Sequence, residues 1–151
     1  MLLLPLEVAG ASYVARFMRM CDRAECEEMV HRLDPTDIAR RLVLTACDGA
    51  LICANNGCPV AVVAATEIVP GTVEVAMIAT DRWPEVSAPV TRWARLDLIP
   101  RLREMGASRA ECRSLATHAI AHRWLERLGF THETDLPDFG KNRETFRPLC
   151  Q

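Results

Sequence analysis

The chain has 151 residues, half of them apolar, and a formal net charge of −2 at pH 7. This length suits one domain with a real core and is short for two, so we expect a single domain over residues 1–151. The nearly balanced charge argues against a strongly basic nucleic-acid binder, and we expect no nucleic-acid partner.

Cysteine usage and the N-terminal run bear on the compartment. The apolar start at residues 1–4 is broken by Pro5 and Glu7, so it is too short for a signal sequence or a membrane span. The odd number of cysteines, without C-x-x-C spacing, predicts reduced thiols in a cytoplasmic compartment and neither a disulfide framework nor a zinc site. The seven are Cys21, Cys26, Cys47, Cys53, Cys58, Cys112 and Cys150.

The first third of the chain predicts an edge strand and three helices. The strand covers residues 2–8, and residues 9–12 read as a turn. Apolar residues at helical spacing predict one helix after this turn and a second from Asp22. Asp34 and Pro35 mark the start of a third helix, because an aspartate N-cap is often followed by proline at the first helical position.

Turn residues divide the next part into three strands. Asn55, Asn56 and Gly57 separate the apolar runs 50–54 and 58–65, which predicts a hairpin. Pro70 and Gly71 form a second turn that leads into the nearly continuous apolar run 73–80. These runs predict three adjacent antiparallel strands, the last covered on both faces.

A long helix should follow, capped by Ser87 and ending before Gly106. Pro100 cannot donate a hydrogen bond to the helix, so we expect a kink or break there. The arginines of this helix are expected in solvent, without the aromatic platform of a nucleic-acid site. Its predicted buried stripe is Val90, Trp93, Leu96, Ile99 and Leu102.

The rest of the chain predicts strand 109–115, a short helix from His118 and two closing strands at 131–136 and 143–149. Gly129 suits the left-handed residue after the short helix, with Phe130 folding back in a Schellman arrangement. The pattern predicts the α/β class, with a mixed sheet and crossover helices. The predicted inner face of the short helix is Ile120, Trp124, Leu125 and Leu128.

The order of these elements, and above all residues 121–130, resembles the A-x-x-F-Y-x-x-x-G-F helix ending of the GNAT acyltransferase superfamily. The resemblance covers residues 58–147. It implies a single GNAT-like (acyl-CoA N-acyltransferase) domain, with a mixed, mostly antiparallel sheet flanked by helices. It also implies transfer of an acyl group, usually acetyl, from acetyl-CoA to an amine.

Within the superfamily, the layout resembles the small GNAT-like proteins of short-tailed bacteriophages, including an internal virion protein. This resemblance implies synthesis in the host cytoplasm followed by entry into the virion. The partners that it implies are other virion or assembly proteins of the portal, tail or internal core. Homo-oligomerisation is left open.

The turn that should hold the cofactor departs from the family pattern. The family binds the CoA diphosphate with the backbone amides of an R/Q-x-x-G-x-G/A turn. Here residues 80–90 contain no glycine, two prolines, a bulky Trp83 and two carboxylates. Losing several charge-assisted hydrogen bonds, each worth about 1.5–3 kcal/mol, would weaken CoA binding by orders of magnitude. The weak cofactor-binding candidates that remain are Ile78, Thr80, Arg82 and Ser87.

Proton-transfer groups are also sparse. The family's tyrosine, which protonates the leaving thiolate, aligns with Leu125, and the only tyrosine is Tyr13 in the first helix. Glu67 and Glu74 are weak candidates for a general base, against the plainer reading as outward-facing strand carboxylates.

Other nucleophile and metal patterns find no support. His118 and His122 share a helical face, but no third ligand stands at useful spacing, so we expect a surface pair and no metal. Cys58 or Cys112 would need an activating base that the sequence does not reveal.

Two hypotheses therefore stand. The first is a GNAT-fold protein with a degenerate acetyl-CoA loop and no cofactor, acting as a virion-associated or assembly protein. The second is an active N-acyltransferase that binds acyl-CoA through splayed strands at residues 78–80 and the Ser87 cap. We favour the first, because the chemical features are missing while the residues that build the fold remain.

Overall fold

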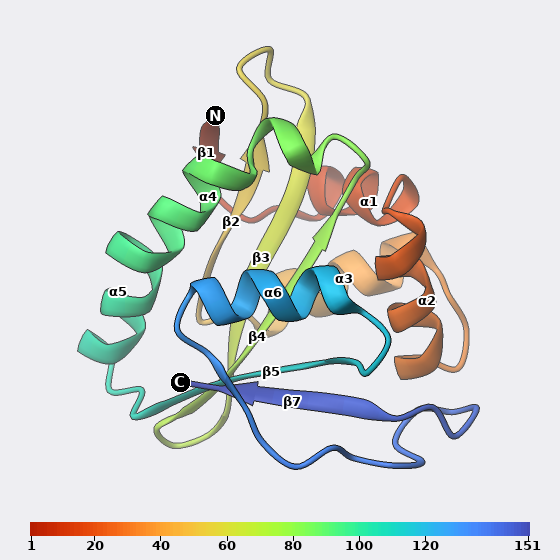
Figure 1. Cartoon of the computed structure of the whole chain (residues 1–151). Helices are drawn as coiled ribbons and strands as arrows, with labels where there is room; N and C mark the ends of the chain where they lie inside the picture. The colour runs from red at the N-terminus through yellow and green to blue at the C-terminus, as the bar shows by residue number, and fades with distance from the viewer.

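The computed structural model describes all residues 1–151, and it places seven strands in one mixed sheet with the order β1-β2-β3-β4-β5-β7-β6 (Figure 1). The strands are β1 (Leu2–Leu4), β2 (Asp48–Cys53), β3 (Pro59–Val69), β4 (Thr72–Ala79), β5 (Arg109–Leu115), β6 (Thr131–His132) and β7 (Phe146–Cys150). The helices are α1 (Val8–Arg16), α2 (Met20–Met29), α3 (Pro35–Thr45), α4 (Ser87–Trp93), α5 (Ile99–Glu104) and α6 (Ala119–Arg127).

Strands β2 to β4 form an antiparallel meander, as the turn residues predict, and β1 pairs antiparallel with β2 at its edge. Strand β5 joins β4 in parallel, but the two pair only over Thr72–Glu74 and Arg109–Glu111. Beyond these residues the strands diverge, and β7 continues the sheet on the far side of β5. Figure 1 shows the resulting wedge between β4 and β5, with α6 lying across it.

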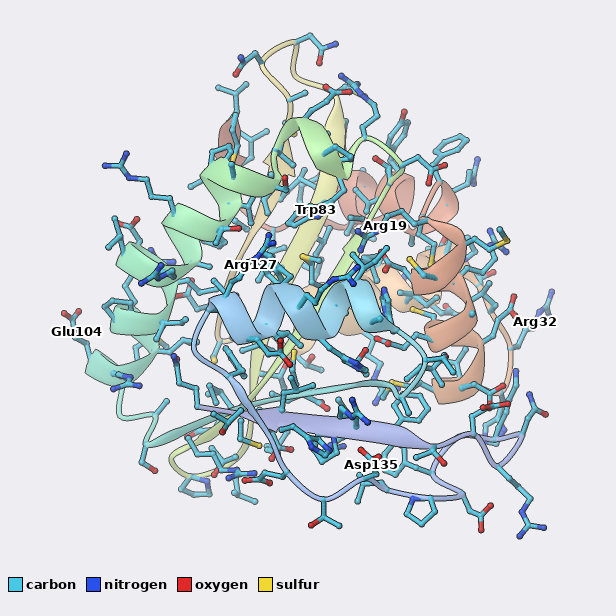
Figure 2. All side chains as sticks on the ribbon, viewed as in Figure 1. Arg19, Arg32, Trp83, Glu104, Arg127 and Asp135 are labelled. Carbon is cyan, nitrogen blue, oxygen red and sulfur yellow. The ribbon has the colours of Figure 1, made fainter.

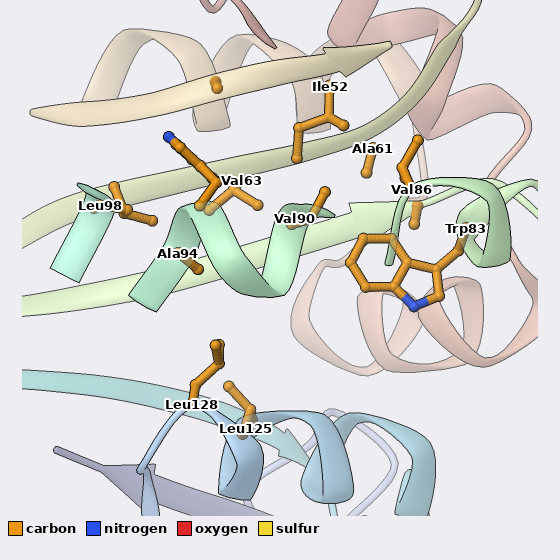
Figure 3. Packing of buried hydrophobic residues seen from close by; sticks show 14 of the residues in the cluster. Ile52, Ala61, Val63, Trp83, Val86, Val90, Ala94, Leu98, Leu125 and Leu128 are labelled. Atoms are coloured by element: carbon orange, nitrogen blue, oxygen red, sulfur yellow. The ribbon is translucent and has the colours of Figure 1, made fainter. Parts of the chain in front are cut away.

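Helices cover both faces of the sheet. On one face α4, α5 and α6 close a core of 21 buried residues (Figure 3). On the other face α1 and α3 close a second core of 10 buried residues. Strand β3 serves both cores, because Val60, Ala61 and Val63 lie in the first and Val62 in the second, so its apolar run is continuous. None of the helices has the length and apolar character needed to cross a membrane.

The N-terminal prediction is wrong in one respect. The first strand ends at Leu4, and residues 9–12 lie inside α1, because the Glu7 carboxylate caps the helix by accepting from the amides of Ala9 and Gly10. Gly10 is needed for packing and not for a turn. A Cβ there would lie 2.3 Å from Leu51 Cδ2 on β2.

The predicted break at Pro100 is confirmed, and it takes the form of a π-helical segment, Ala94–Leu98, between α4 and α5. The amide of Ile99 bonds to the carbonyl of Ala94, five residues back. The extra residue rotates the helix surface, so Leu96 is 62% exposed and its predicted burial is wrong. Ser87 is the first helical residue and makes no side-chain cap, so that prediction is also wrong.

The end of α6 is confirmed as a Schellman arrangement. The amide of Phe130 bonds to the carbonyl of Leu125, and Gly129 has φ +95°. Ile120 is 55% exposed, contrary to prediction, because α6 turns this position away from the sheet core. The first closing strand, β6, is shorter than expected. The second, β7, ends one residue later than expected.

Candidate functional site

The wedge between β4 and β5 is the candidate site. It opens at the C-terminal end of β4, where two neighbouring parallel strands separate, and such a crevice is the usual ligand position in an open α/β sheet. Helices α4 and α6 flank it on one face. The second hypothesis above also places acyl-CoA here, at residues 78–80 and Ser87.

The chain fills this wedge with its own residues. The junction between α1 and α2 runs along the free edge of β4, where Met18 forms an isolated bridge with Thr80. The amide of Arg19 donates to the carbonyl of Ala79 at 2.8 Å, and the amide of Ala79 donates to Oδ2 of Asp22 at 2.8 Å. Both backbone groups that Ala79 turns toward the wedge therefore have partners within the protein.

The Arg19 and Asp22 side chains that flank these bonds form a buried ion pair. Asp22 is 3% exposed and accepts from Nε of Arg19 at 3.0 Å and from Nη2 at 2.8 Å. Burial raises the pKa of the Asp22 carboxyl, whereas the Arg19 charge and the Ala79 amide act in the opposite direction. The Arg19 guanidinium also lies 5.6 Å from the centre of the Trp83 ring, and Figure 2 shows the two side by side near α6.

Glu25, one helical turn after Asp22, fills the β5 side of the wedge. Its Oε2 accepts from the amide of Leu115 at 2.9 Å and from Oγ of Ser114 at 2.7 Å. The same oxygen lies 3.1 Å from Nδ1 of His118. Helix α2 therefore binds the diverging edges of both strands through carboxylates.

The predicted surface pair of histidines is wrong. His118 is 7% exposed and His122 is 6% exposed, because α2 and β5 cover this end of α6. Burial lowers the pKa of His122, and the nearby Arg147 charge acts in the same direction. The sequence signal that could have indicated the burial of the histidines is the pair of acids in α2, Asp22 and Glu25. These acids stand three residues apart, so they lie on the same face of the helix.

Trp124 closes the gap between α6 and α4. Its Nε1 donates to Oγ1 of Thr91 at 2.9 Å. Its ring meets the ring of Trp83 edge to face, with centroids 5.5 Å apart. The two helices on this side of the wedge are thus joined by direct contacts.

The loop after β4 offers few free amides. The backbone amide of Trp83 donates to the carbonyl of Thr80 at 3.0 Å, and the backbone amide of Arg82 donates to Oγ1 of the same threonine at 3.3 Å. The amides of Glu85 and Val86 also bond within the loop. A diphosphate would have to displace these bonds before it could use the amides.

Arg82 is also engaged. Its guanidinium forks onto the carboxylate of Glu85, at 2.8 and 2.7 Å. These hydrogen bonds lower the pKa of Glu85. The one basic side chain of the loop is therefore paired with an acid instead of standing free for an anion.

The structure gathers only part of the residues predicted for a site. Thr80, Arg82 and Ser87 lie together at the end of β4, but the Ile78 side chain packs into the core on the opposite face with α1 and α3. Leu125, at the tyrosine position of the resemblance, is buried in the other core.

Glu67 and Glu74 lie toward the other end of the sheet. Glu74 is six residues before Thr80 on an extended strand, a separation of about 20 Å. It pairs with Arg113 at 3.4 Å, while Glu67 accepts from the amide of Gly71 at 3.1 Å. The structure thus brings neither carboxylate to the loop after β4.

The seven cysteines are all free. Cys53 and Cys150 are buried, Cys47 is exposed, and the others are intermediate. Cys112 donates to the carbonyl of Val75 at 2.6 Å, and burial strongly raises the pKa of its thiol. This environment does not favour Cys112 as a nucleophile.

The sequence matches no protein-family model and no curated protein. Solved structures match over nearly the whole chain. A ribosomal-protein-alanine N-acetyltransferase from Brucella melitensis has a TM-score of 0.74 and 13% identity, with 100% of this chain and 99% of that chain covered. The ribosomal-protein-S18-alanine N-acetyltransferase from Escherichia coli has a TM-score of 0.71 and 15% identity, with 99% and 91% covered. A probable GNAT-family acetyltransferase from Chromobacterium violaceum has a TM-score of 0.66 and 18% identity, with 99% and 85% covered.

At these identities the likeness establishes the fold. The chain has the GNAT fold, a mixed seven-stranded sheet flanked by helices, and the predicted fold class is confirmed. The comparisons support the fold that the resemblance implies and do not bear on its bacteriophage part.

Proposed function

We propose that this GNAT-fold chain does not carry out acyl-CoA-dependent catalysis and works as a non-catalytic binding or assembly protein. The observation that carries the proposal is the filling of the wedge by Arg19 and Asp22, which take both backbone groups of Ala79. A ligand that entered along β4 would have to displace the buried Arg19–Asp22 pair from both backbone groups of Ala79.

Two further observations support the proposal. Four amides of the loop after β4, those of Arg82, Trp83, Glu85 and Val86, make internal bonds, and the Arg82 side chain is paired with Glu85. Leucine at position 125 has no proton to give a leaving thiolate. The features that build the fold are present, whereas the groups with chemical roles are missing or otherwise engaged.

The finer proposal is a virion-associated role in a short-tailed bacteriophage, and its support is the layout of the sequence. Particles produced from the genome that encodes the chain provide the test. We expect mass spectrometry to find the chain in purified particles together with portal, tail or internal-core proteins. Its absence from particles, with abundant protein in the infected cell, would exclude this role.

Titration calorimetry with acetyl-CoA tests the loss of cofactor binding. We expect no heat of binding up to millimolar acetyl-CoA for a sample that is folded by circular dichroism. The competing function is an active N-acyltransferase that moves an acyl group from acyl-CoA to an amine.

A matched pair of variants shows whether any binding of acetyl-CoA takes place at the loop after β4. Arg82→Ala removes the basic group of the loop, and Arg95→Ala removes an exposed arginine from the π-helical segment. One-to-one binding in the micromolar range that Arg82→Ala abolishes and Arg95→Ala preserves would overturn the proposal in favour of the enzyme.

A further inference from the structure

A buried histidine nitrogen in the wedge has no partner. His118 is 7% exposed, and its Nε2 makes no hydrogen bond. Its other nitrogen, Nδ1, lies 3.1 Å from the Glu25 carboxylate. A neutral imidazole that donates from Nδ1 leaves a lone pair on Nε2, and a buried unpaired acceptor costs free energy. Nε2 of His118 is therefore a candidate ligand-binding atom.

The atoms that face this lone pair are of the right chemical kind for a metal ion. Oδ1 of Asp22 lies 3.8 Å from Nε2 of His118, and Sγ of Cys21 lies 3.7 Å from the same oxygen. All three ligand atoms lie within 4.8 Å of one another. Thiolate, imidazole and carboxylate are the ligands that Zn²⁺ takes in proteins.

The spacing of these atoms approaches that around a tetrahedral ion. Bonds of about 2.0–2.3 Å keep the ligand atoms of such an ion roughly 3.3–3.6 Å apart. The two separations measured to Oδ1 exceed this range by up to about half an ångström, and the third, between Sγ of Cys21 and Nε2 of His118, is up to 4.8 Å, so it must shorten most. Side-chain torsions of Cys21 and His118 can supply such shifts, while Asp22 stays fixed by Arg19 and Ala79.

Arg19 is the one cation beside the site, and it does not block it. It donates to both oxygens of Asp22, and Oδ1 also accepts weakly from Sγ of Cys21 at 3.7 Å, so loss of the thiol proton leaves Oδ1 a lone pair for the ion. With a divalent ion and a Cys21 thiolate, the charges of the ion, Arg19, Asp22, Glu25 and Cys21 sum to zero. A bound cation would deprotonate the thiol, against the effect of burial and of Asp22, which raise the pKa of Cys21.

We propose that Cys21, Asp22 and His118 bind a thiophilic divalent cation, best fitted by Zn²⁺. Glu25 holds the imidazole by its Nδ1–H, as second carboxylates do in zinc sites. On binding, the Cys21 S–H gives its proton to solvent, a metal–sulfur bond forms, and a water completes the fourth position. The ion ties α2 to the start of α6 across the wedge. This inference does not depend on the function proposed above.

Cobalt titration of the whole chain, first dialysed against a chelator, is the test. Tetrahedral Co²⁺ bound to a thiolate gives visible bands and a sulfur-to-metal charge-transfer band. We expect both kinds of band to saturate at one Co²⁺ per chain and to disappear when Zn²⁺ is added. We also expect Zn²⁺ to raise the melting temperature of the protein.

Variants identify the ligands. Cys21→Ser should remove the charge-transfer band and the effect of Zn²⁺ on the melting temperature. Glu25→Gln, which keeps an oxygen toward Leu115, should weaken Zn²⁺ binding roughly 10–100-fold. Cys47→Ser and Cys58→Ser are the matched controls, because both thiols lie outside the cluster, and they should bind as the unaltered chain does.

The same data can overturn the proposal. Failure to reach one-to-one saturation at micromolar Co²⁺ would do so, as would a charge-transfer band that survives in Cys21→Ser and vanishes in Cys47→Ser or Cys58→Ser. Cys21 is only half-buried, so its serine variant should fold, and circular dichroism checks this. The proposal therefore does not depend on a His118 variant that could fail to fold.

Discussion

Asp22 is the residue on which the contacts of the wedge converge. It binds Arg19 within its own turn and the amide of Ala79 on β4, 57 residues away. An aspartate in the first turn of a helix usually complements the helix dipole in solvent, so the sequence gives no reason to expect its burial. Only the pairing of the α1–α2 junction with β4 makes it a buried group.

Replacing Asp22 with alanine should be strongly destabilising. The change leaves the Arg19 charge, which is 12% exposed, and the Ala79 amide without an acceptor. Breaking a buried pair by removing one partner costs about 3–5 kcal/mol of unfolding free energy. Urea denaturation followed by circular dichroism measures the loss.

Arg40→Ala is the matched control for Asp22→Ala. Arg40 pairs with Asp37 at 3.8 Å, and both side chains are mostly exposed. Its removal should change the unfolding free energy by less than about 1 kcal/mol. Equal effects of the two substitutions would show that Asp22 is not a buried anchor of the wedge.

At the scale of elements, the accurate predictions rest on residues that act locally. Asp34 caps α3 by accepting from the amides of Thr36 and Asp37, and Gly129 ends α6 as its position predicts. The errors arise where a residue serves a distant element. Gly10 resembles a turn residue, but it makes room for Leu51, and the register of α5 depends on the π-helical segment before Pro100.

The end of α6 can be tested through Gly129→Ala. Gly129 has φ +95°, a region that costs an L-residue about 1–2 kcal/mol. A Cβ there would also lie 2.6 Å from Nε2 of Gln151 and displace its hydrogen bond to the carbonyl of Leu128. Losing that bond adds about 1 kcal/mol, so we expect a total loss of about 2–3 kcal/mol by urea denaturation.

Gly57→Ala separates the two contributions. Gly57 also has a positive φ, +81°, but no atom lies within 4 Å of a Cβ there. Its alanine variant should therefore lose only the backbone part, about 1–2 kcal/mol. If Gly57→Ala cost as much as Gly129→Ala, the contact with Gln151 would contribute nothing.

At the scale of the molecule, the sequence indicates what the site lacks but not what replaces it. The missing glycines of residues 80–90 are visible in the sequence, and the structure adds that four of the loop's amides and the Arg82 side chain are bonded internally. The filling of the wedge joins α1 and α2 to β4, β5 and α6. Those contacts depend on the tertiary arrangement, so neither Asp22 nor Glu25 could be assigned to the site beforehand.

The single domain predicted from the length of the chain can be tested through the two cores. Strand β3 contributes to both, so a loss of packing on one face should destabilise the other. All three tryptophans of the chain pack on the face covered by α4, α5 and α6, so their fluorescence reports chiefly that face. Val14 is fully buried in the core on the opposite face.

Val14→Ala should therefore lower the unfolding free energy by about 1–3 kcal/mol, and by the same amount whether tryptophan fluorescence or circular dichroism is followed in urea. Leu44→Ala, at a position that is 77% exposed, should change it by less than about 0.5 kcal/mol. A fluorescence midpoint that stays in place while the circular dichroism midpoint falls would mean that the two faces unfold separately. The shared strand would then fail to couple them, and the chain would not unfold as one cooperative unit.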